Sequence, residues 1–536
     1  MEIPTKSPVS AAGIQPHKSG VNYQHGPAAE QSDGRDIDGI VPVLSMGEGK
    51  FVVTATGNTM KKNMGSLTMF AVCFNVCNCW AGTASSLQIA LLQGGPASLL
   101  YGMIVSSTVY LAVAWSMAEL ASVYPTAGGQ YHFASILAPR RLNAVISYTC
   151  GLLTVFSWIA IAAAVTMIPA TQILALASFY HPHFLPKPWH YFVLFEAIVI
   201  IILAYNTFLL KNLPRTHDVG FAWSISMFIA LTIVIFARSS PKADSSFVWA
   251  SFINASGWPD GLCFLGSLLT TCFIYGGLDA ALHLAEETPN PRTAVPKAAV
   301  NAVLIGFATA FIFTITLLYS ISDFDAVISI QGYLPFELYR QGMRSDSGAV
   351  ATMVFSMGLV FFVLNAVMQT SSRLTWAFAK DNALVFSGAL GKIHPGLDIP
   401  LNSLLLNTAL VAVCGCIFLA SSTAFNAFLG SLVVLQQFSF MIPTALLLFR
   451  RRSSKFLPAD RKYALPDRLG WCANIWLVGM SILLAVVFML PPFRPVTTTN
   501  MNYTVVILGI AAVLGVANWF LHARKQYQGP RIVLEN

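Results

Sequence analysis

The sequence predicts an all-α polytopic membrane protein with twelve transmembrane helices. Many of its apolar runs exceed the roughly 18–20 residues that a helix needs to cross a bilayer. Only 10% of the 536 residues are charged, against about a quarter in soluble globular proteins. The mean hydropathy is +0.65. We therefore expect the lipid bilayer to surround most of the chain.

The chain divides into a polar tail, a helical region and a short polar end. Residues 1–65 are rich in Gly, Ser, Pro and charge and have no apolar core near the start. We expect them to form a disordered cytosolic tail without a cleavable signal peptide. The helical domain should span residues 66–523, and residues 524–536 should form a short cytosolic tail. The predicted transmembrane segments are residues 68–91, 96–121, 143–169, 191–210, 217–237, 262–284, 298–320, 349–378, 402–420, 425–449, 473–490 and 504–522.

The orientation follows from the distribution of Lys and Arg, which concentrate in cytosolic loops. Because the number of segments is even, both termini lie on one side. The loops on that side contain Arg140, Arg141, Lys211, Arg215, Arg292, Lys297, Lys380, Lys392, Arg450, Arg451, Arg452, Lys455, Arg461, Lys462 and Arg468. The opposite loops contain only Lys187, Arg238, Lys242, Arg340, Arg344 and Arg494. The bias predicts that both termini are cytosolic. It also predicts that the long loop 321–348, which can partly fold as a short amphipathic helix, faces outward.

Composition and motifs argue against several other classes of function. The 9 cysteines are odd in number and lie mostly in apolar runs, so we expect small buried residues rather than a disulfide framework. Cys77 and Cys79 are too close together for the usual zinc pairing and have no second pair. The net charge of +8 comes mainly from short loops and not from an aromatic-basic platform for nucleic acid. No nucleophile–base motif or nucleotide-binding loop occurs, so we expect neither an enzyme nor a cofactor.

Two of the predicted helices contain interruptions near their centres. Gly276-Gly277 lies in the sixth segment, and "NVCNCWAGTASS", with Asn75, Asn78, Gly82 and Thr83, lies in the first. These two helices correspond if the first ten form two five-helix inverted repeats, followed by two extra C-terminal helices. Paired interruptions at matching positions are typical of the substrate site of a secondary transporter. The alternative is that the glycines only allow close packing between helices.

A row of ionisable residues follows the interruption in the sixth segment. Asp279, His283 and Glu286 are spaced i, i+4 and i+7, which places them on one helical face. Ionisable groups in membrane segments usually face the bundle interior and mark ion or substrate pathways. We favour a functional role for Asp279, which lies closest to the interruption and which we expect on the cavity side. His283 fits a hydrogen-bonded packing role better than that of a proton relay. Glu286 and Glu287 can instead cap the helix or pair with Arg292 or Arg373.

Three motifs resemble the amino acid–polyamine–organocation superfamily. They are "MAELASVYPTAGGQYHFASILAP" (117–139), "GGLDAALHLAEETPNPRTAVPKA" (276–298) and "QTSSRLTWAFAKDNALVFS" (369–387). The chain is most similar to the fungal amino acid/choline transporters, which include permeases for choline, 4-aminobutyrate and polyamines. The resemblance covers about residues 65–525. It implies a ten-helix inverted-repeat core plus helices 11 and 12, with substrate held at the unwound centres of helices 1 and 6.

The resemblance also implies positions for the site. In helix 1 the matching segment is Asn78, Cys79, Trp80, Ala81, Gly82 and Thr83. In helix 6 it is Phe273, Ile274, Tyr275, Gly276, Gly277 and Leu278, followed by Asp279. Phe273 resembles the aromatic residue that covers the substrate in related transporters, and Trp158, Asn365 and Gln369 are further candidates. Related amino acid permeases often carry a Gly-Ser/Thr-Gly pattern in helix 1 whose free N–H groups bind a carboxylate. The bulkier stretch from Trp80 to Thr83 weakens that expectation.

These features predict a secondary active transporter that imports a small amine or amino acid. Aromatic side chains would contact an ammonium group through cation–π interactions. Asp279, with His283 and Glu286, would supply the counter-charge or carry a coupled proton. Coupling to sodium is an alternative, because the hydroxyl oxygens of Thr370, Ser371 and Ser372 could bind a sodium ion. The alternative is a nutrient sensor on the same fold, against which the modest tails argue. We expect the plasma membrane, with the vacuolar membrane as the alternative. The motif 117–139 is interpreted as an inner gate or scaffold in which Glu119, Arg140 and Arg141 pair with the end of helix 8, around Arg373, Lys380 and Asp381.

Overall fold

The computed structural model describes residues 50–52, 60, 62–209, 213–329, 332–498, 500–527, 529–530 and 533–535. Its contacts divide the chain into Met1–Pro42, which lies outside the described residues, and Val43–Asn536, which contains every element below. Most of the predicted N-terminal tail therefore lies outside the described residues. Within the two predicted tails, β1 (Lys50–Val52) pairs antiparallel with β2 (Val533–Glu535).

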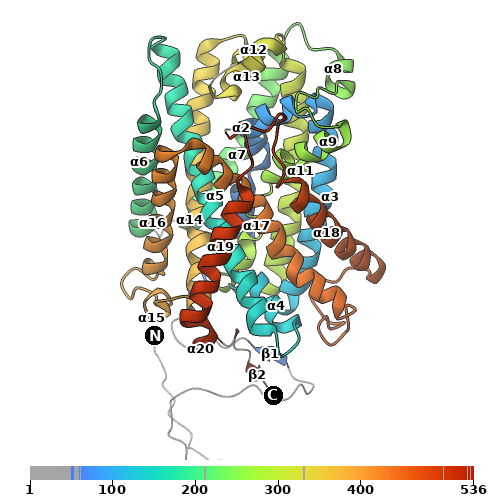
Figure 1. Ribbon diagram of the computed structural model, residues 1–536, viewed down its shortest axis with the longest axis vertical. Helices are drawn as coiled ribbons and strands as arrows, with labels where there is room; N and C mark the ends of the chain where they lie inside the picture. The colour runs from blue at the N-terminus through green and yellow to red at the C-terminus, as the bar shows by residue number, and fades with distance from the viewer. Residues whose placement is uncertain are drawn as a thin grey trace, which may run out of the picture. The chain divides into compact units, whose positions relative to one another are not determined.

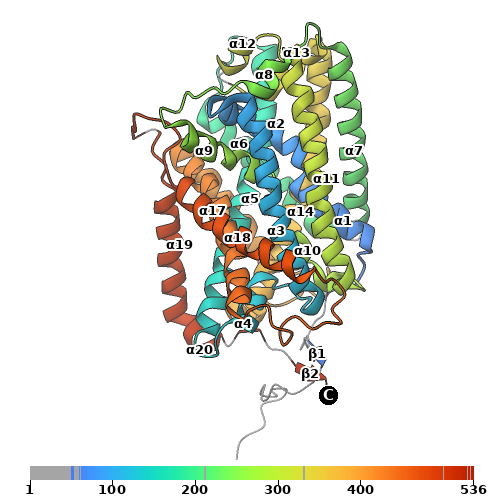
Figure 2. The same ribbon diagram turned by 90° about the vertical axis from the view of Figure 1, so that its right-hand side faces the viewer.

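The described chain is predominantly helical (Figures 1 and 2). Its long helices are α1 (Ser66–Cys77), α2 (Cys79–Leu92), α3 (Gly95–Val123), α5 (Asn143–Tyr180), α6 (Pro188–Phe208), α7 (Leu213–Arg238), α9 (Asp260–Phe273), α11 (Pro291–Ser320), α14 (Asp346–Lys380), α16 (Leu401–Ala420), α17 (Ser422–Phe449), α18 (Asp467–Val487) and α19 (Thr504–Asn518). The last of these continues through a π-helical turn, η3 (Trp519–Ala523), into α20 (Arg524–Gln526). The other short helices are α4 (Gln130–Leu137), α8 (Ser245–Ala250), α10 (Ala280–His283), η2 (Ala285–Glu287), α12 (Phe324–Ser329), α13 (Leu334–Met343) and α15 (Ser387–Leu390).

The predicted fold class is confirmed. Among the described residues, eleven helices are long and apolar enough to cross a membrane, with α1 and α2 counted as one span. Each coincides with one of the predicted segments. The remaining segment, predicted at 262–284, is divided between α9 and α10. The chain is thus a multi-pass membrane protein.

The interruption in the first span lies at a single residue. Asn78 adopts the left-handed conformation, with φ of 34° and ψ of 54°, and its N–H donates to the carbonyl of Phe74. Asparagine tolerates this region better than most residues. The helix resumes at Cys79, because the N–H groups of Ala81 and Gly82 donate to the carbonyl of Asn78. The expectation of an unwound stretch from Asn78 to Thr83 is therefore wrong, since Cys79–Thr83 are helical.

The interruption in the sixth span is longer, and glycine makes it possible. Residues 274–279 form turns between α9 and α10, and Gly277 has a φ of +82°. A side chain there would be strained, and an added Cβ would lie 2.4 Å from Cγ1 of Val76. Within the turns, N–H groups bond to carbonyls three residues earlier, from Tyr275 to Cys272 and from Leu278 to Tyr275. Both predicted interruptions are thus present, at Asn78 and at residues 274–279.

The two ends of the helix bundle carry different short helices. In both views α12 and α13 lie at one end, called here the α13 end, while α4 and α20 lie at the opposite end, the α4 end (Figures 1 and 2). The predicted amphipathic helix in loop 321–348 is present as α13, which buries Leu334, Phe336 and Leu338. Its polar residues Glu337 and Arg340 form an ion pair that is part-exposed.

One predicted interaction at the α4 end is wrong. Glu119 on α3 does not pair with the end of α14. Its carboxylate instead accepts from Arg452 at 2.7 Å and from Arg461 at 2.8 Å, in the segment after α17. Glu119 is fully buried, whereas Arg140 and Arg141, which were predicted to pair with the same end of α14, are exposed. The pair joins α3 to the α17–α18 connection, which is far away in the sequence.

Candidate functional site

The two interruptions lie against each other in the interior of the bundle. The thiol of Cys79, directly after the break at Asn78, donates to the carbonyl oxygen of Ile274 at 3.2 Å. Gly82, one turn further, leaves room for Ile274, whose side chain would lie 3.6 Å from an added Cβ. Gly277 packs more tightly, since an added Cβ would lie 2.4 Å from Cγ1 of Val76. The two broken helices are therefore in direct contact at their interruptions.

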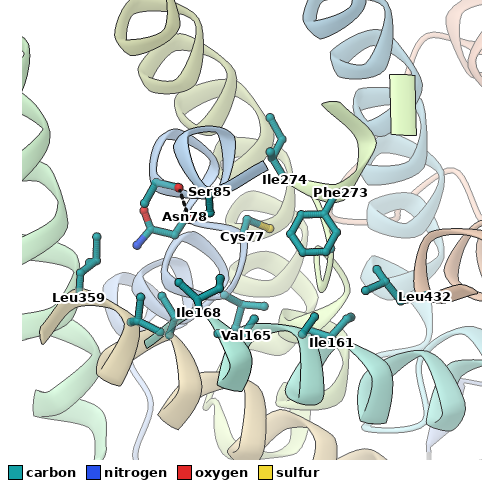
Figure 3. Close-up of a pocket in the computed structure, with 17 residues that line it drawn as sticks. Cys77, Asn78, Ser85, Ile161, Val165, Ile168, Phe273, Ile274, Leu359 and Leu432 are labelled. Atoms are coloured by element: carbon teal, nitrogen blue, oxygen red, sulfur yellow. Dashed lines mark hydrogen bonds between the residues drawn. The ribbon is translucent and has the colours of Figure 1, made fainter. Parts of the chain in front are cut away.

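A cavity of about 60 Å³ lies beside these breaks (Figure 3). Its polar side chains are Cys77, Asn78 and Ser85, from the first span. Phe273 and Gly276 line it from the sixth span, and Figure 3 shows the ring of Phe273 beside Cys77. The rest of the lining is apolar and comprises Val76, Ala81, Gly82, Ile161, Ala164, Val165, Ile168, Ile274, Leu359, Val360, Val363 and Leu432. Helices α5, α14 and α17 thus complete the cavity, in agreement with the helices 3, 8 and 10 that the resemblance implies.

Asn78, which lines this cavity, has a side-chain amide that is only half hydrogen-bonded. Its side-chain oxygen accepts from the hydroxyl of Ser224 at 3.2 Å. Its side-chain nitrogen is buried and has no hydrogen-bond partner in the described part of the chain. A buried amide left unpaired is unfavourable by about 1–3 kcal/mol. A ligand with an acceptor atom, such as a hydroxyl or a carboxylate, would relieve this penalty.

Toward the α13 end, polar side chains close over the cavity. The hydroxyl of Tyr333, just before α13, lies 3.1 Å from that of Ser85. Gln172 of α5 donates to the same tyrosine at 3.2 Å and to Ser356 of α14 at 3.0 Å. Three spans and the α12–α13 loop are therefore joined above the cavity.

Toward the α4 end, Asp279 occupies the centre of a buried hydrogen-bond network. Its Oδ2 accepts from Gln130 Nε2 at 2.6 Å and from Trp158 Nε1 at 3.1 Å, and it lies 2.9 Å from His283 Nε2. Its Oδ1 accepts from Gln436 Nε2 at 3.2 Å. Asp279 is 3% exposed and is absent from the cavity lining. The expectation that Asp279 lies on the cavity side is wrong for this conformation. The hydrogen-bond network holds its carboxylate against Trp158, toward the α4 end.

The other acidic residues of this segment take separate partners. Glu287 forms a buried ion pair with Arg373 at 2.7 Å, one of the two partners that the sequence suggested. Glu286 lies 4.0 Å from Lys380 and accepts from the backbone N–H of Ala127 at 3.4 Å. Because α10 ends after one turn, the predicted common face holds for Asp279 and His283 and does not extend to Glu286.

Several predicted site residues point away from the cavity. The indole of Trp80 donates to Ser224 and packs edge-on against Phe313. The ring of Tyr275 stacks on that of Tyr110, and its hydroxyl is hydrogen-bonded to the hydroxyl of Ser107. Thr83 donates to the carbonyl of Cys79 within its own helix, and Asn365 accepts from Asn206 of α6. Their roles in binding stay predictions, and they would need another conformation to reach a substrate.

Sequence reasoning missed Gln130 and Gln436, which hold Asp279. Both are uncharged polar residues that are fully buried, and Gln436 lies inside a long apolar run. A polar residue inside an apolar run is a signal that the sequence offers, because a buried amide needs hydrogen-bond partners. It could not reveal the partner, since Gln130 lies 149 positions and Gln436 157 positions from Asp279 in the sequence.

A helical bundle with paired breaks around an internal cavity defines the class of secondary transporters. The family profile described as amino acid permease matches residues 65–512. The chain belongs to this amino acid permease family, within the amino acid–polyamine–organocation superfamily. Membership of this family indicates a membrane transporter of small organic substrates.

Three relatives illustrate the range of the family. The choline transporter of Saccharomyces cerevisiae is 31% identical over 522 residues, covering 97% of this chain and 91% of the relative. The amino-acid permease 2 of Neurospora crassa is 27% identical, covering 88% and 86%. The 7-keto 8-aminopelargonic acid transporter of S. cerevisiae is 26% identical, covering 84% and 90%.

Proposed function

We propose that this protein is a proton-coupled importer of a small amine or amino acid that works by alternating access. The observation that carries the proposal is the cavity between the breaks at Asn78 and residues 274–279. Toward the α4 end the buried network of Asp279 lies beyond it, and toward the α13 end Tyr333 contacts Ser85 at its rim. With both termini cytosolic, the α13 end faces outward.

The size of the cavity supports a mechanism that requires movement. Pockets that hold small ligands measure about 300–1,000 Å³, several times the 60 Å³ of this cavity. The described conformation is thus too small for a bound amine. In alternating access, one end of the bundle opens at a time, which would enlarge the cavity and expose it to one side of the membrane.

The lining supports a substrate with an apolar body and few polar groups. Trp158 is absent from the cavity lining and donates to Asp279, whereas Phe273 offers an aromatic face at the cavity. Such faces attract ammonium groups. The free amide donor of Asn78 suits an acceptor on the same molecule. Choline, 4-aminobutyrate, polyamines and amino acids are the candidates, and choline fits both features because it carries a quaternary ammonium and a hydroxyl.

Asp279 supports coupling to protons. A carboxylate enclosed by the protein and removed from water is a typical site for a proton that moves during transport. Its distance from the cavity lining favours this role over that of a direct counter-charge in the closed conformation. The two roles differ in their consequences. Loss of a counter-charge would lower the affinity for cationic substrates and leave the affinity for zwitterions unchanged, whereas loss of a proton site would remove the response of uptake to a pH gradient.

An uptake screen tests the proposal. The chain is expressed in yeast that lacks choline and amine permeases, and labelled choline, 4-aminobutyrate, polyamines and amino acids are offered. We expect uptake of at least one of them, raised by external acid. Gly277→Leu, delivered equally to the membrane, is the inactive control. Binding without uptake across the panel would favour the alternative, a sensor on the same fold.

A further inference from the structure

The pair Asp279–His283 has a geometry that fixes its number of protons. His283 Nδ1 lies 2.9 Å from the backbone carbonyl oxygen of Ala127, and Nε2 lies 2.9 Å from Oδ2 of Asp279. Neither side chain of the pair has exposed surface. The two ring nitrogens therefore face two oxygen atoms in the interior of the bundle, without water to complete either contact.

Both of these contacts need a hydrogen atom. A carbonyl oxygen can only accept, so Nδ1 must carry a proton and donate to Ala127. A second proton must then lie between Nε2 and Oδ2, because an unprotonated nitrogen facing a carboxylate would place two lone pairs in contact. The pair thus holds one proton more than a neutral histidine beside an ionised aspartate.

The surrounding donors place that proton on the histidine. Gln130 and Trp158 donate to Oδ2, and Gln436 donates to Oδ1. Hydrogen bonds to the charged form of a carboxyl group stabilise that form. The arrangement is therefore an aspartate and an imidazolium, whose charges cancel within the bundle.

The other titratable and charged groups around the pair are neutral, have partners of their own or are exposed. Thiols are neutral at pH 7 when their pKa has its usual value of about 8.5. Glu287 is paired with Arg373, and Glu286 is near Lys380. On α4, Tyr131 and His132 both contact Asp381. The remaining neighbours are the thiols Cys73 and Cys77 of α1 and Cys150 of α5, and the exposed Arg292 and Lys297 of α11.

The same proton connects the pair to the α4 end. Ala127 lies in residues 124–129, the connector between α3 and α4, and Gln130 is the first residue of α4. Gly129 of the connector, with a φ of +52°, packs directly on Leu282 and His283 of α10. Without the extra proton, His283 can donate to Ala127 or to Asp279, and not to both. One of the bonds between the connector, α10 and Asp279 is then lost.

We propose that the Asp279–His283 pair binds the proton that is coupled to transport, and that this proton allows His283 to hydrogen-bond the connector and Asp279 at the same time. The proposal rests on the proton-coupled transport proposed above. The conformation closed at the α4 end binds one proton more than a conformation in which the pair has separated. Raising the pH therefore favours opening at this end, and the proton leaves on the cytosolic side together with the substrate.

Two substitutions at the pair, with a buried histidine as control, test the proposal. His283→Gln keeps one donor and removes the titration. Asp279→Asn removes the negative charge that the extra proton balances, while Nδ1–H of a neutral His283 can still donate to Ala127. The amide oxygen can still accept from Gln130 and Trp158. The matched control is His217→Gln on α7. His217 is also buried, and its Nε2 contacts only the side-chain oxygen of Gln369, so a neutral ring suffices.

The readout is the number of protons that enter with each labelled choline in proteoliposomes containing a pH-sensitive dye. We expect one proton per choline for the wild type and for His217→Gln. We expect none for His283→Gln and Asp279→Asn, with exchange of internal for external choline retained by Asp279→Asn. Wild-type proton entry by His283→Gln would overturn the inference while leaving proton-coupled transport intact. Choline entry without protons in the wild type itself would refute both.

A second readout needs no substrate and serves if choline is not carried. The thermal midpoint of the purified protein is measured from acid to alkaline pH. Loss of the extra proton breaks one of the two contacts of His283, so the pair holds the connector and α10 together only while that proton is bound. The wild type and His217→Gln should lose stability over that range, and His283→Gln should lose less. Identical pH profiles for wild type and His283→Gln would contradict the proposal.

Discussion

Replacing Gly277 with alanine should disfavour the closed conformation strongly. The φ of +82° is left-handed, which raises the free energy of a residue with a Cβ by about 1–2 kcal/mol. The new Cβ would also lie 2.4 Å from Cγ1 of Val76 and 3.2 Å from Cη2 of Trp158. Overpacking of this kind is unfavourable by about 1–3 kcal/mol. The sum of about 2–5 kcal/mol corresponds to a shift of about 30-fold or more in the equilibrium toward conformations that separate the two breaks.

Uptake and thermal stability of the purified protein measure this effect. Gly277→Ala should lower the thermal midpoint and reduce substrate accumulation, and Gly277→Leu should abolish uptake while still reaching the membrane. Gly266→Ala on α9 is the matched control, because no atom lies within 4 Å of its added Cβ. It should retain transport and be neutral or slightly more stable. Wild-type stability and uptake in Gly277→Ala would mean that the turn tolerates a side chain and that the contact with Val76 does not restrain it.

Three other predictions follow from the structure. Protease protection of tags in sealed right-side-out vesicles should leave both termini protected from outside, and cleavage of both tags would reverse the orientation. Cys77 lines the cavity, so a small cationic thiol reagent should inhibit uptake, substrate should slow the reaction, and Cys77→Ser should be resistant. Because Cys416 and Cys472 are exposed, they are replaced first, and inhibition that persists in Cys77→Ser would place the reactive thiol elsewhere. Glu119→Gln removes the 2.7 Å ion pair of the buried Arg452 and leaves it only Asp467 at 3.8 Å, which should destabilise the fold by about 3–5 kcal/mol in thermal or denaturant unfolding. An unchanged midpoint would show that Asp467 suffices as the partner of Arg452.

The spans could be predicted from the sequence because each depends on a local property. Length and hydropathy of an apolar run decide whether it crosses a bilayer. In the described part of the chain eleven of the twelve predicted segments are spans, and the twelfth is divided between α9 and α10. The breaks were located for the same reason, since Gly277 marks a conformation that most residues avoid. The first break was placed too broadly, because Asn78 alone provides it and the helix resumes at once.

The direction of side chains could not be predicted in the same way. Asp279 was expected on the cavity side from its helical position, yet Gln130 and Gln436 hold it in a network toward the α4 end. Glu119 was assigned to α14, and its partners follow α17. In each case the deciding contact joins residues distant in the sequence, and hydrophobic periodicity carries no information about such pairs. Short-range spacing did succeed for Asp279 and His283, which are four residues apart.

The central claim is that the chain drives a small amine or amino acid across the membrane with the energy of a proton gradient. The most direct measurement is the steady-state concentration of labelled substrate inside proteoliposomes that contain the purified protein, with an inward proton gradient imposed. We predict accumulation above the external concentration, lost when a protonophore is added and absent in Gly277→Leu. Binding without entry, or entry that stops at equal concentrations and ignores the gradient, would contradict the account.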